Sequence, residues 1–190
     1  MSNFEFVTVL MSIVVGLGIT RILSGFASLV ENRQQIELDG VTIVWALNVL
    51  GYHLLFWWIV VNNWSDLPEW SFTEFGALFV YGVLIFFCAS LIMPQTVPSG
   101  TNMKQRFETI RRPFFALWVL VVIAELTDSF LKGTAYVTGE LGLPYLGFIS
   151  SLTALAVAGI FVADRRYHYT AAILFFSLHA FWMMGWFWTI

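Results

Sequence analysis

Two histidines and two carboxylates lie inside long apolar stretches of this sequence: His53, Glu125, Asp128 and His179. An ionisable side chain is costly in hydrocarbon, so the default interpretation is that it faces the interior of a helix bundle and marks a site. Imidazole changes its charge near physiological pH, and a nearby carboxylate can exchange protons with it. These residue types therefore predict a proton relay or a binding site for a polar solute.

The same side chains leave three other interpretations open. His53, His179 and Glu125 would form a two-histidine, one-carboxylate ligand set for a divalent metal. One histidine from each of two helices would suffice as the axial ligands of haem b. In a purely structural alternative, each imidazole is hydrogen-bonded to a neighbouring helix. Because the sequence has no HExxH, paired-cysteine or CxxCH motif, we expect no cofactor, with haem b or a metal as lesser alternatives.

Glu125 and Asp128 are three residues apart, so a helix would place both carboxylates on one face. Two neighbouring carboxylates repel each other when charged, and burial disfavours the charged form further, so at least one is expected to hold a proton near neutral pH. Lys132 follows Asp128 by four residues and is predicted to pair with it. Glu125 has no such local partner, which makes it the stronger functional candidate.

The composition identifies the environment of these residues. The chain has 190 residues, of which 59% are hydrophobic and 11% are charged. An average soluble domain is about 25% charged, so this composition excludes a water-soluble globule, and the abundant apolar mass excludes disorder. The net charge of −3 and the lack of a basic tail argue against nucleic acid as a partner, and the single cysteine excludes an intrachain disulfide. An integral membrane protein in contact with the lipid bilayer is predicted.

Six apolar stretches are long enough to cross a bilayer, which requires about 20 residues each. They are residues 6–23, 41–61, 75–93, 113–131, 144–163 and 169–188. The first could continue to Val30, and it is expected to be a retained helix because it lacks the flanks of a signal peptide. The predicted fold is a single all-α domain over residues 1–190, a bundle of six transmembrane helices.

The polar loop before the fourth stretch leads to two predictions about helix starts. Pro113 is expected at the first helical position, where a missing N–H is tolerated. Thr101 or Asn102 is expected to cap a separate short helix in the preceding loop.

Two pairs of segments suggest an internal repeat: residues 14–21 can be aligned with 121–128, and residues 84–88 with 173–177. These short, mostly apolar matches predict at most a weak 3+3 inverted repeat.

The basic residues predict the orientation of the bundle. Eight of the nine lysines and arginines lie on the first, third and fifth connections or the adjoining helix ends, which leaves only Lys132 on the other side. Under the positive-inside rule, the basic connections are cytoplasmic and both termini face outward. The expected location is a bacterial-type inner (plasma) membrane.

Polar side chains from five of the six stretches fall at a similar depth when 1.5 Å is allowed per residue. They are Ser12, His53, Tyr81, Glu125 and His179, with Asn48 slightly further in and Asp128 in support. This layer near the midplane predicts a small transporter or channel for an ion or small polar solute, with proton coupling as one form. The alternatives are a redox membrane protein that binds haem or quinone, and a structural or accessory subunit.

Small residues in the first stretch indicate close helix packing, namely Gly16, Gly18 and Thr20. Six helices make a narrow bundle, so a homo-oligomer is expected. No nucleophile is arranged with either histidine by a recognisable spacing, and an enzyme is therefore not expected.

Overall fold

The computed structural model describes residues 3–64 and 70–187, and the regular secondary structure of this part is entirely helical, without a strand. The predicted all-α class is confirmed. The helices are α1 (Asn3–Glu31), α2 (Gly40–Asn63), α3 (Phe72–Ile92), α4 (Met103–Leu131), the short π-helix η1 (Tyr136–Leu141), α5 (Gly142–Phe161) and α6 (Arg165–Phe187).

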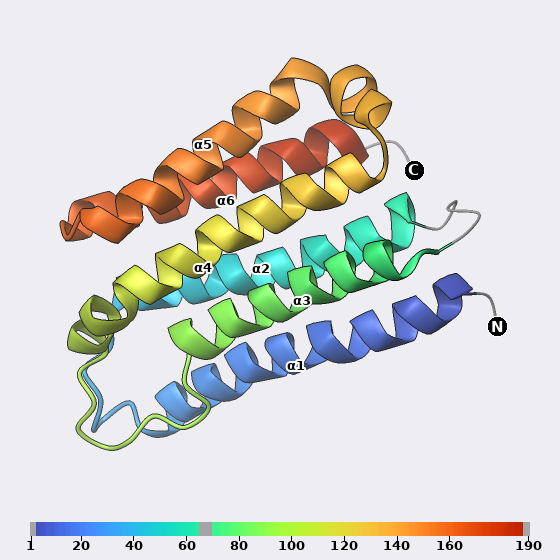
Figure 1. Cartoon of the computed structure of the whole chain (residues 1–190). Helices are drawn as coiled ribbons and strands as arrows, with labels where there is room; N and C mark the ends of the chain where they lie inside the picture. Colours follow the sequence, from blue (N-terminus) through green and yellow to red (C-terminus); the bar gives the residue numbers. More distant parts are fainter. Residues whose placement is uncertain (1–2, 65–69, 188–190) are drawn as a thin grey trace.

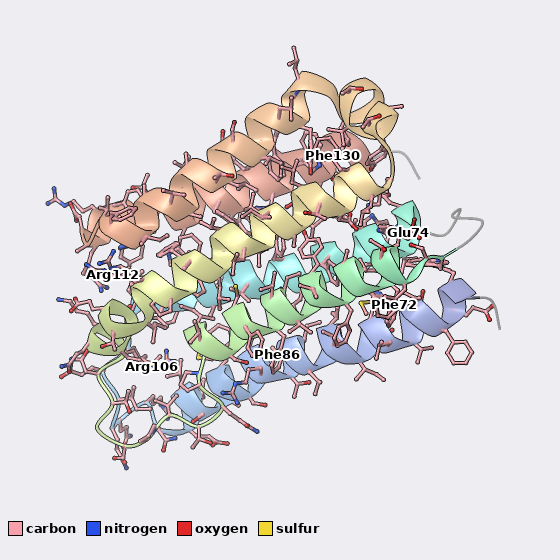
Figure 2. All side chains as sticks on the ribbon, in the orientation of Figure 1. Phe72, Glu74, Phe86, Arg106, Arg112 and Phe130 are labelled. Carbon is pink, nitrogen blue, oxygen red and sulfur yellow. The ribbon has the colours of Figure 1, made fainter. Side chains whose placement is uncertain are left out.

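The six long helices run roughly parallel or antiparallel to one another (Figure 1). Helices α1, α3, α4 and α5 follow each other across the front of the bundle, and α2 and α6 lie behind them. The α1–α2, α3–α4 and α5–α6 connections lie at one end, which we call the basic end because Arg106 and Arg112 are found there (Figure 2). Both described chain ends lie at the opposite end, with Glu74 and Phe130.

Five of the described helices, α1 to α5, are long and apolar enough to cross a membrane. Helix α6 has 23 described residues and runs alongside these five, but it does not meet the same criterion of length and apolar composition. Large apolar side chains cover the outside of the bundle; Phe6, Phe161 and Phe181, for example, are each at least two-thirds exposed. Such a surface suits lipid and not water, so the structure indicates an integral membrane protein.

Helix α4 differs from the sequence prediction. The side chain of Asn102 accepts a hydrogen bond from the Gln105 N–H (2.9 Å), so the predicted cap is present. The helix it starts is not separate, however, and continues through Pro113 to Leu131. The prediction that Pro113 occupies the first helical position is therefore wrong. Membrane helices tolerate an internal proline where neighbouring groups satisfy the backbone.

The basic end is closed by two polar anchors. Nη1 of Arg111 lies 2.8–2.9 Å from the carbonyl oxygens of Gly159, Ile160 and Val162, which are orphan acceptors at the C-terminal end of α5. Asp39 caps α2 by accepting from the backbone N–H (3.0 Å) and hydroxyl (2.7 Å) of Thr42, and its other oxygen forms an ion pair with Arg165 at the start of α6. These contacts join α2 to α6 and α4 to α5.

The Asp39 anchor predicts a pH-dependent contribution to stability. Burial alone would raise the pKa of this carboxyl, but the hydrogen bonds from Thr42 and the Arg165 guanidinium outweigh it and hold the pKa below its ordinary value. The contribution is complete above the pKa of the unfolded chain and is lost as pH falls through the folded value, below about pH 4. We expect Asp39→Asn to lower the free energy of unfolding by about 1 kcal/mol at pH 7 and by much less at pH 3. Unfolding in detergent at both pH values checks this, and an equal loss at both would contradict it.

Candidate functional site

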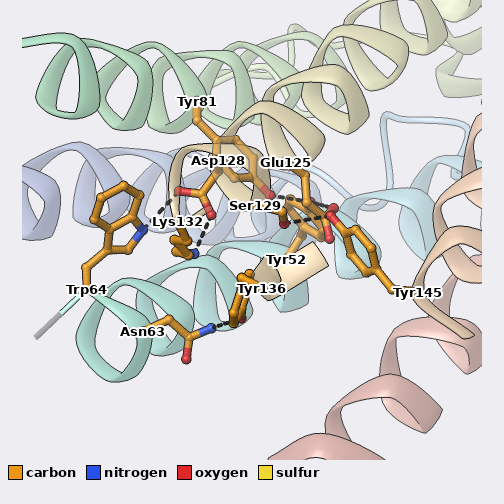
Figure 3. Close-up of polar contacts among 10 residues, drawn as sticks. All are labelled: Tyr52, Asn63, Trp64, Tyr81, Glu125, Asp128, Ser129, Lys132, Tyr136 and Tyr145. Atoms are coloured by element: carbon orange, nitrogen blue, oxygen red, sulfur yellow. Dashed lines mark hydrogen bonds and ion pairs between the residues drawn. The ribbon is translucent and has the colours of Figure 1, made fainter. Parts of the chain in front are cut away.

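The centre of the candidate site is a chain of three side chains from three helices. The hydroxyl of Tyr52 on α2 donates a hydrogen bond to Oε2 of Glu125 on α4 (2.7 Å), and the hydroxyls of Tyr52 and Tyr81 on α3 are 2.6 Å apart (Figure 3). Because Tyr52 has one proton and directs it to the carboxylate, Tyr81 donates to Tyr52. Both tyrosines are buried, and Glu125 is partly buried.

An ion pair lies one helical turn along α4 from Glu125. Nζ of Lys132 is 2.6 Å from Oδ2 of Asp128, and Nε1 of Trp64 donates to Oδ1 of the same carboxylate (2.9 Å). The ammonium group also lies 5.0 Å from the Trp64 ring centre and 5.7 Å from that of Tyr136, which favours a cation–π contribution. The predicted pairing of Asp128 with Lys132 is confirmed, and it leaves Glu125 as the carboxylate without a cationic partner among the described residues.

A small polar cavity joins these two groups. It has a volume of about 30 Å³, enough for roughly one water molecule, and its walls include Tyr81, Glu125, Asp128, Lys132 and Tyr136. Lys132 follows Glu125 by seven positions, a rise of about 10 Å along the helix. The cavity therefore extends from Glu125 toward the end of the bundle that carries η1. Two hydrogen bonds complete its rim, between Ser129 and Tyr145 (2.7 Å) and from Asn63 to Tyr136 (3.2 Å).

The path from Glu125 toward the basic end is filled by aromatic rings. Trp118 packs edge to face against Tyr52 at 5.1 Å between ring centres, and Trp45 and Phe175 continue the cluster at 4.6–5.5 Å. Phe114 and Phe115 extend the cluster further. Each of the five side chains that pack here beyond Tyr52 is no more than 1% exposed: Trp45, Phe114, Phe115, Trp118 and Phe175. Polar groups and a small cavity thus lie on the η1 side of Glu125, and packed aromatic rings lie on the side of the basic end.

The histidines occupy two different places. The ring of His179 on α6 packs against Tyr52 and Phe148 at 5.0 and 5.3 Å, so it lies beside the cluster without a hydrogen bond to it. His53 instead faces α1, where its ring contacts Gly18. In both His53 and His179, Nδ1 bonds the carbonyl oxygen four residues earlier, at 2.8 Å.

Two more candidates satisfy their polar groups away from the cluster. Asn48 donates to the carbonyl oxygens of Val44 (3.0 Å) and Ala172 (3.1 Å), which ties α2 to α6. Ser12 is exposed and donates to the Thr8 carbonyl of its own helix (2.8 Å). Of the predicted site residues, the structure brings together Glu125, Asp128 and Tyr81, with His179 adjacent through the Tyr52 ring.

No group of three or more histidine, cysteine, aspartate or glutamate side chains in residues 3–64 and 70–187 could hold a metal ion. The ring of His53 lies against Gly18 of α1, whereas the ring of His179 lies against Tyr52. A haem or a metal bound by these residues stays a prediction.

Sequence reasoning missed Tyr52, which joins Glu125 to Tyr81 and to the aromatic cluster. Its hydroxyl reaches Glu125 while its ring contacts His179 and Trp118. A signal was present, since Tyr52 directly precedes His53 and so lies at almost the same depth as Glu125. A buried tyrosine hydroxyl needs a partner, and Glu125 was the nearest unpaired acceptor at that level.

The small residues of α1 differ in what surrounds them. A Cβ added at Gly18 would collide with the imidazole of His53, whereas nothing lies within 4 Å of one added at Gly16. Thr20 is exposed. Gly18 is thus the position at which α1 approaches the His53 side chain of α2.

This difference predicts unequal effects of two identical substitutions. Gly18→Ala is expected to reduce the free energy of unfolding by about 1–3 kcal/mol, because His53 is buried and held by Val49 and cannot easily move away. Gly16→Ala, two residues away on the same helix, is expected to be neutral or stabilising by up to about 1 kcal/mol. Thermal unfolding in detergent compares the two. Equal losses would show that the contact between Gly18 and His53 does not limit packing.

No protein family model matches the chain, and no curated protein or solved structure matches it either. The site consists of a carboxylate inside a helix bundle that is hydrogen-bonded to Tyr52, which is bonded in turn to Tyr81. A small polar cavity lies beside the carboxylate on the side of η1. Such a carboxylate can bind and release a proton or a small cation.

Proposed function

We propose that this chain is a transporter for an ion or small polar solute, coupled to protons through Glu125. One observation carries the proposal. Glu125 lies inside the bundle with a tyrosine hydroxyl as its hydrogen-bond donor, and no lysine or arginine of the described residues forms an ion pair with it. A carboxylate inside a membrane bundle is costly, so its presence is by default the sign of a functional site.

The shape of the surroundings favours a transporter over an open channel. A small polar cavity lies on the η1 side of Glu125, whereas the buried aromatic cluster around Trp45 and Trp118 fills the side of the basic end. Alternating access requires states in which a central site is closed toward one side of the membrane. Under the predicted orientation, with the basic end in the cytoplasm, the polar side is the outer one.

The test is a flux assay with the full chain in proteoliposomes. A pH gradient is imposed, and internal pH is followed with a trapped dye in the presence of sodium, potassium, ammonium or small neutral solutes. The proposal predicts proton movement that depends on at least one of these solutes and exceeds that of protein-free liposomes. Proton movement equal to that of empty liposomes under every condition would overturn it.

A further inference from the structure

A second cavity lies between α2 and α6, and Tyr52 is one of its walls. Its volume is about 300 Å³, and its walls are mainly apolar and aromatic. Leu54 and Phe176 on its rim are 57% and 58% exposed on the surface that faces lipid. The groove is therefore open sideways to the bilayer, where an apolar molecule can enter without crossing water.

Four polar side chains line this groove: Asn48, Tyr52, Trp58 and His179. The donors of Asn48, Tyr52 and His179 are bonded to other groups of the protein. Asn48 uses its amide nitrogen for the carbonyls of Val44 and Ala172. Tyr52 directs its only hydroxyl proton to Glu125. What these side chains still present to a ligand is acceptor capacity, since amide and hydroxyl oxygens each have two lone pairs.

His179 provides the strongest of these acceptors. Its Nδ1 lies 2.8 Å from the carbonyl oxygen of Phe175, and a carbonyl only accepts, so Nδ1 carries the proton. In the neutral imidazole Nε2 is then an acceptor, and it is buried without a hydrogen-bond partner among the described residues. A buried acceptor left unpaired is costly, which favours a ligand that donates a hydrogen bond to it.

We propose that the groove between α2 and α6 binds the head group of a membrane quinol, with a quinol hydroxyl donating to Nε2 of His179. A volume near 300 Å³ is at the lower end for ligand sites and suits a single ring system. Tyr52, Trp58 and Phe176 offer ring faces and edges against which an aromatic head group packs. The isoprenoid tail leaves past Leu54 into lipid.

The proposal separates the two redox forms of the ligand. A quinol carries hydroxyl donors, whereas the oxidised quinone carries only carbonyl acceptors, which His179 Nε2 cannot satisfy. It does not rest on the proposed transport function, because retention of a quinol requires no flux through Glu125.

The test uses the full chain in phosphatidylcholine nanodiscs. The probes are a short-tailed naphthoquinol kept reduced under anaerobic conditions, the matching naphthoquinone, and dodecanol, which has a hydroxyl but no ring. Retained probe is measured over empty nanodiscs. We expect the quinol to bind about tenfold more tightly than the quinone, as one hydrogen bond allows, and dodecanol not to displace it. Equal binding of quinol and quinone, or displacement by dodecanol at equal concentration, would overturn the proposal.

Three variants locate the site. His179→Leu is expected to remove the preference for quinol. Gly51→Leu fills the groove from α2, where an added side chain meets open space, and should abolish retention of quinol without loss of fold. His53→Leu is the matched control, because this histidine has the same backbone bond but faces α1, and binding should be unchanged. Full quinol binding by folded Gly51→Leu would contradict the proposal even if His179→Leu fails to fold.

Discussion

Glu125→Gln is expected to reduce proton-coupled flux roughly hundredfold while the bundle stays folded. The amide has the shape of the carboxyl, and its oxygen can still accept the hydrogen bond from Tyr52. It cannot bind and release a proton at neutral pH, however, and a positioned proton-transfer group contributes about 10²-fold or more. The initial rate of internal pH change in proteoliposomes measures the effect, with gel filtration and circular dichroism to establish folding.

Glu108→Gln is the matched control for this substitution. Glu108 lies on the same helix α4, near the basic end, and its side chain is exposed, so the chemical change is identical but outside the cluster. We expect it to retain the flux of the unaltered chain. Full flux in folded Glu125→Gln protein would show that no proton passes through this carboxyl.

The alternative of an accessory subunit predicts a different pair of results. If the polar layer served only helix packing, Glu125→Gln and His179→Ala would lower stability and leave any flux unchanged. The transport proposal predicts the reverse for Glu125, since the hydrogen bond to Tyr52 survives the substitution. Stability and flux measured on the same preparation therefore distinguish the two functions.

Contacts within one helix were predictable from the sequence, and contacts between helices were not. Asp128 and Lys132 are four residues apart on α4, so local geometry alone places them together. Depth along a helix was also predictable, which is why Tyr81 and Glu125 were assigned to one level. Direction around the helix axis was not, because apolar residues surround every membrane helix and reveal no inward face.

Tyr52 and His53 show the consequence of that limit. They are consecutive on α2 and so differ in direction by about 100°. The packing of α2 against α1, α3, α4 and α6 sends Tyr52 to Glu125 and His53 to Gly18. To predict which of Tyr52 and His53 faces Glu125, one must know which helices are neighbours. The hydropathy of the sequence does not give that information.

The same reasoning explains Ser12 and Asn48. Both side chains satisfy themselves with backbone carbonyls, Ser12 entirely within its own helix. A short polar side chain in a membrane helix therefore need not face the interior. Glu125 has no such backbone partner among the described residues, and its hydrogen bond comes from Tyr52 on another helix. Depth and charge together pointed to this residue from the sequence.

Breaking the Asp128–Lys132 ion pair is expected to have the largest effect on stability. The two side chains are only 6% and 7% exposed, so neither charge can be solvated when its partner is removed. Asp128→Asn keeps an acceptor for Trp64 but leaves the ammonium group unpaired, and Lys132→Met leaves the carboxylate unpaired. Each single substitution is expected to lower the free energy of unfolding by about 3–5 kcal/mol, measured by denaturant unfolding in detergent.

The double variant decides whether the loss comes from the unpaired charge. Combining Asp128→Asn with Lys132→Met removes both charges and replaces the lysine stem by an apolar side chain of similar length. Replacement of a whole buried pair is often nearly neutral, so the double variant is expected to be more stable than either single variant. Losses that simply add would mean that Asp128 and Lys132 act independently, through Trp64 and Tyr136, and that the ion pair itself does not hold this end of the cavity together. Because Glu125 is untouched in all three variants, their flux also reports whether the paired charges at the η1 end are needed for a proton to reach it.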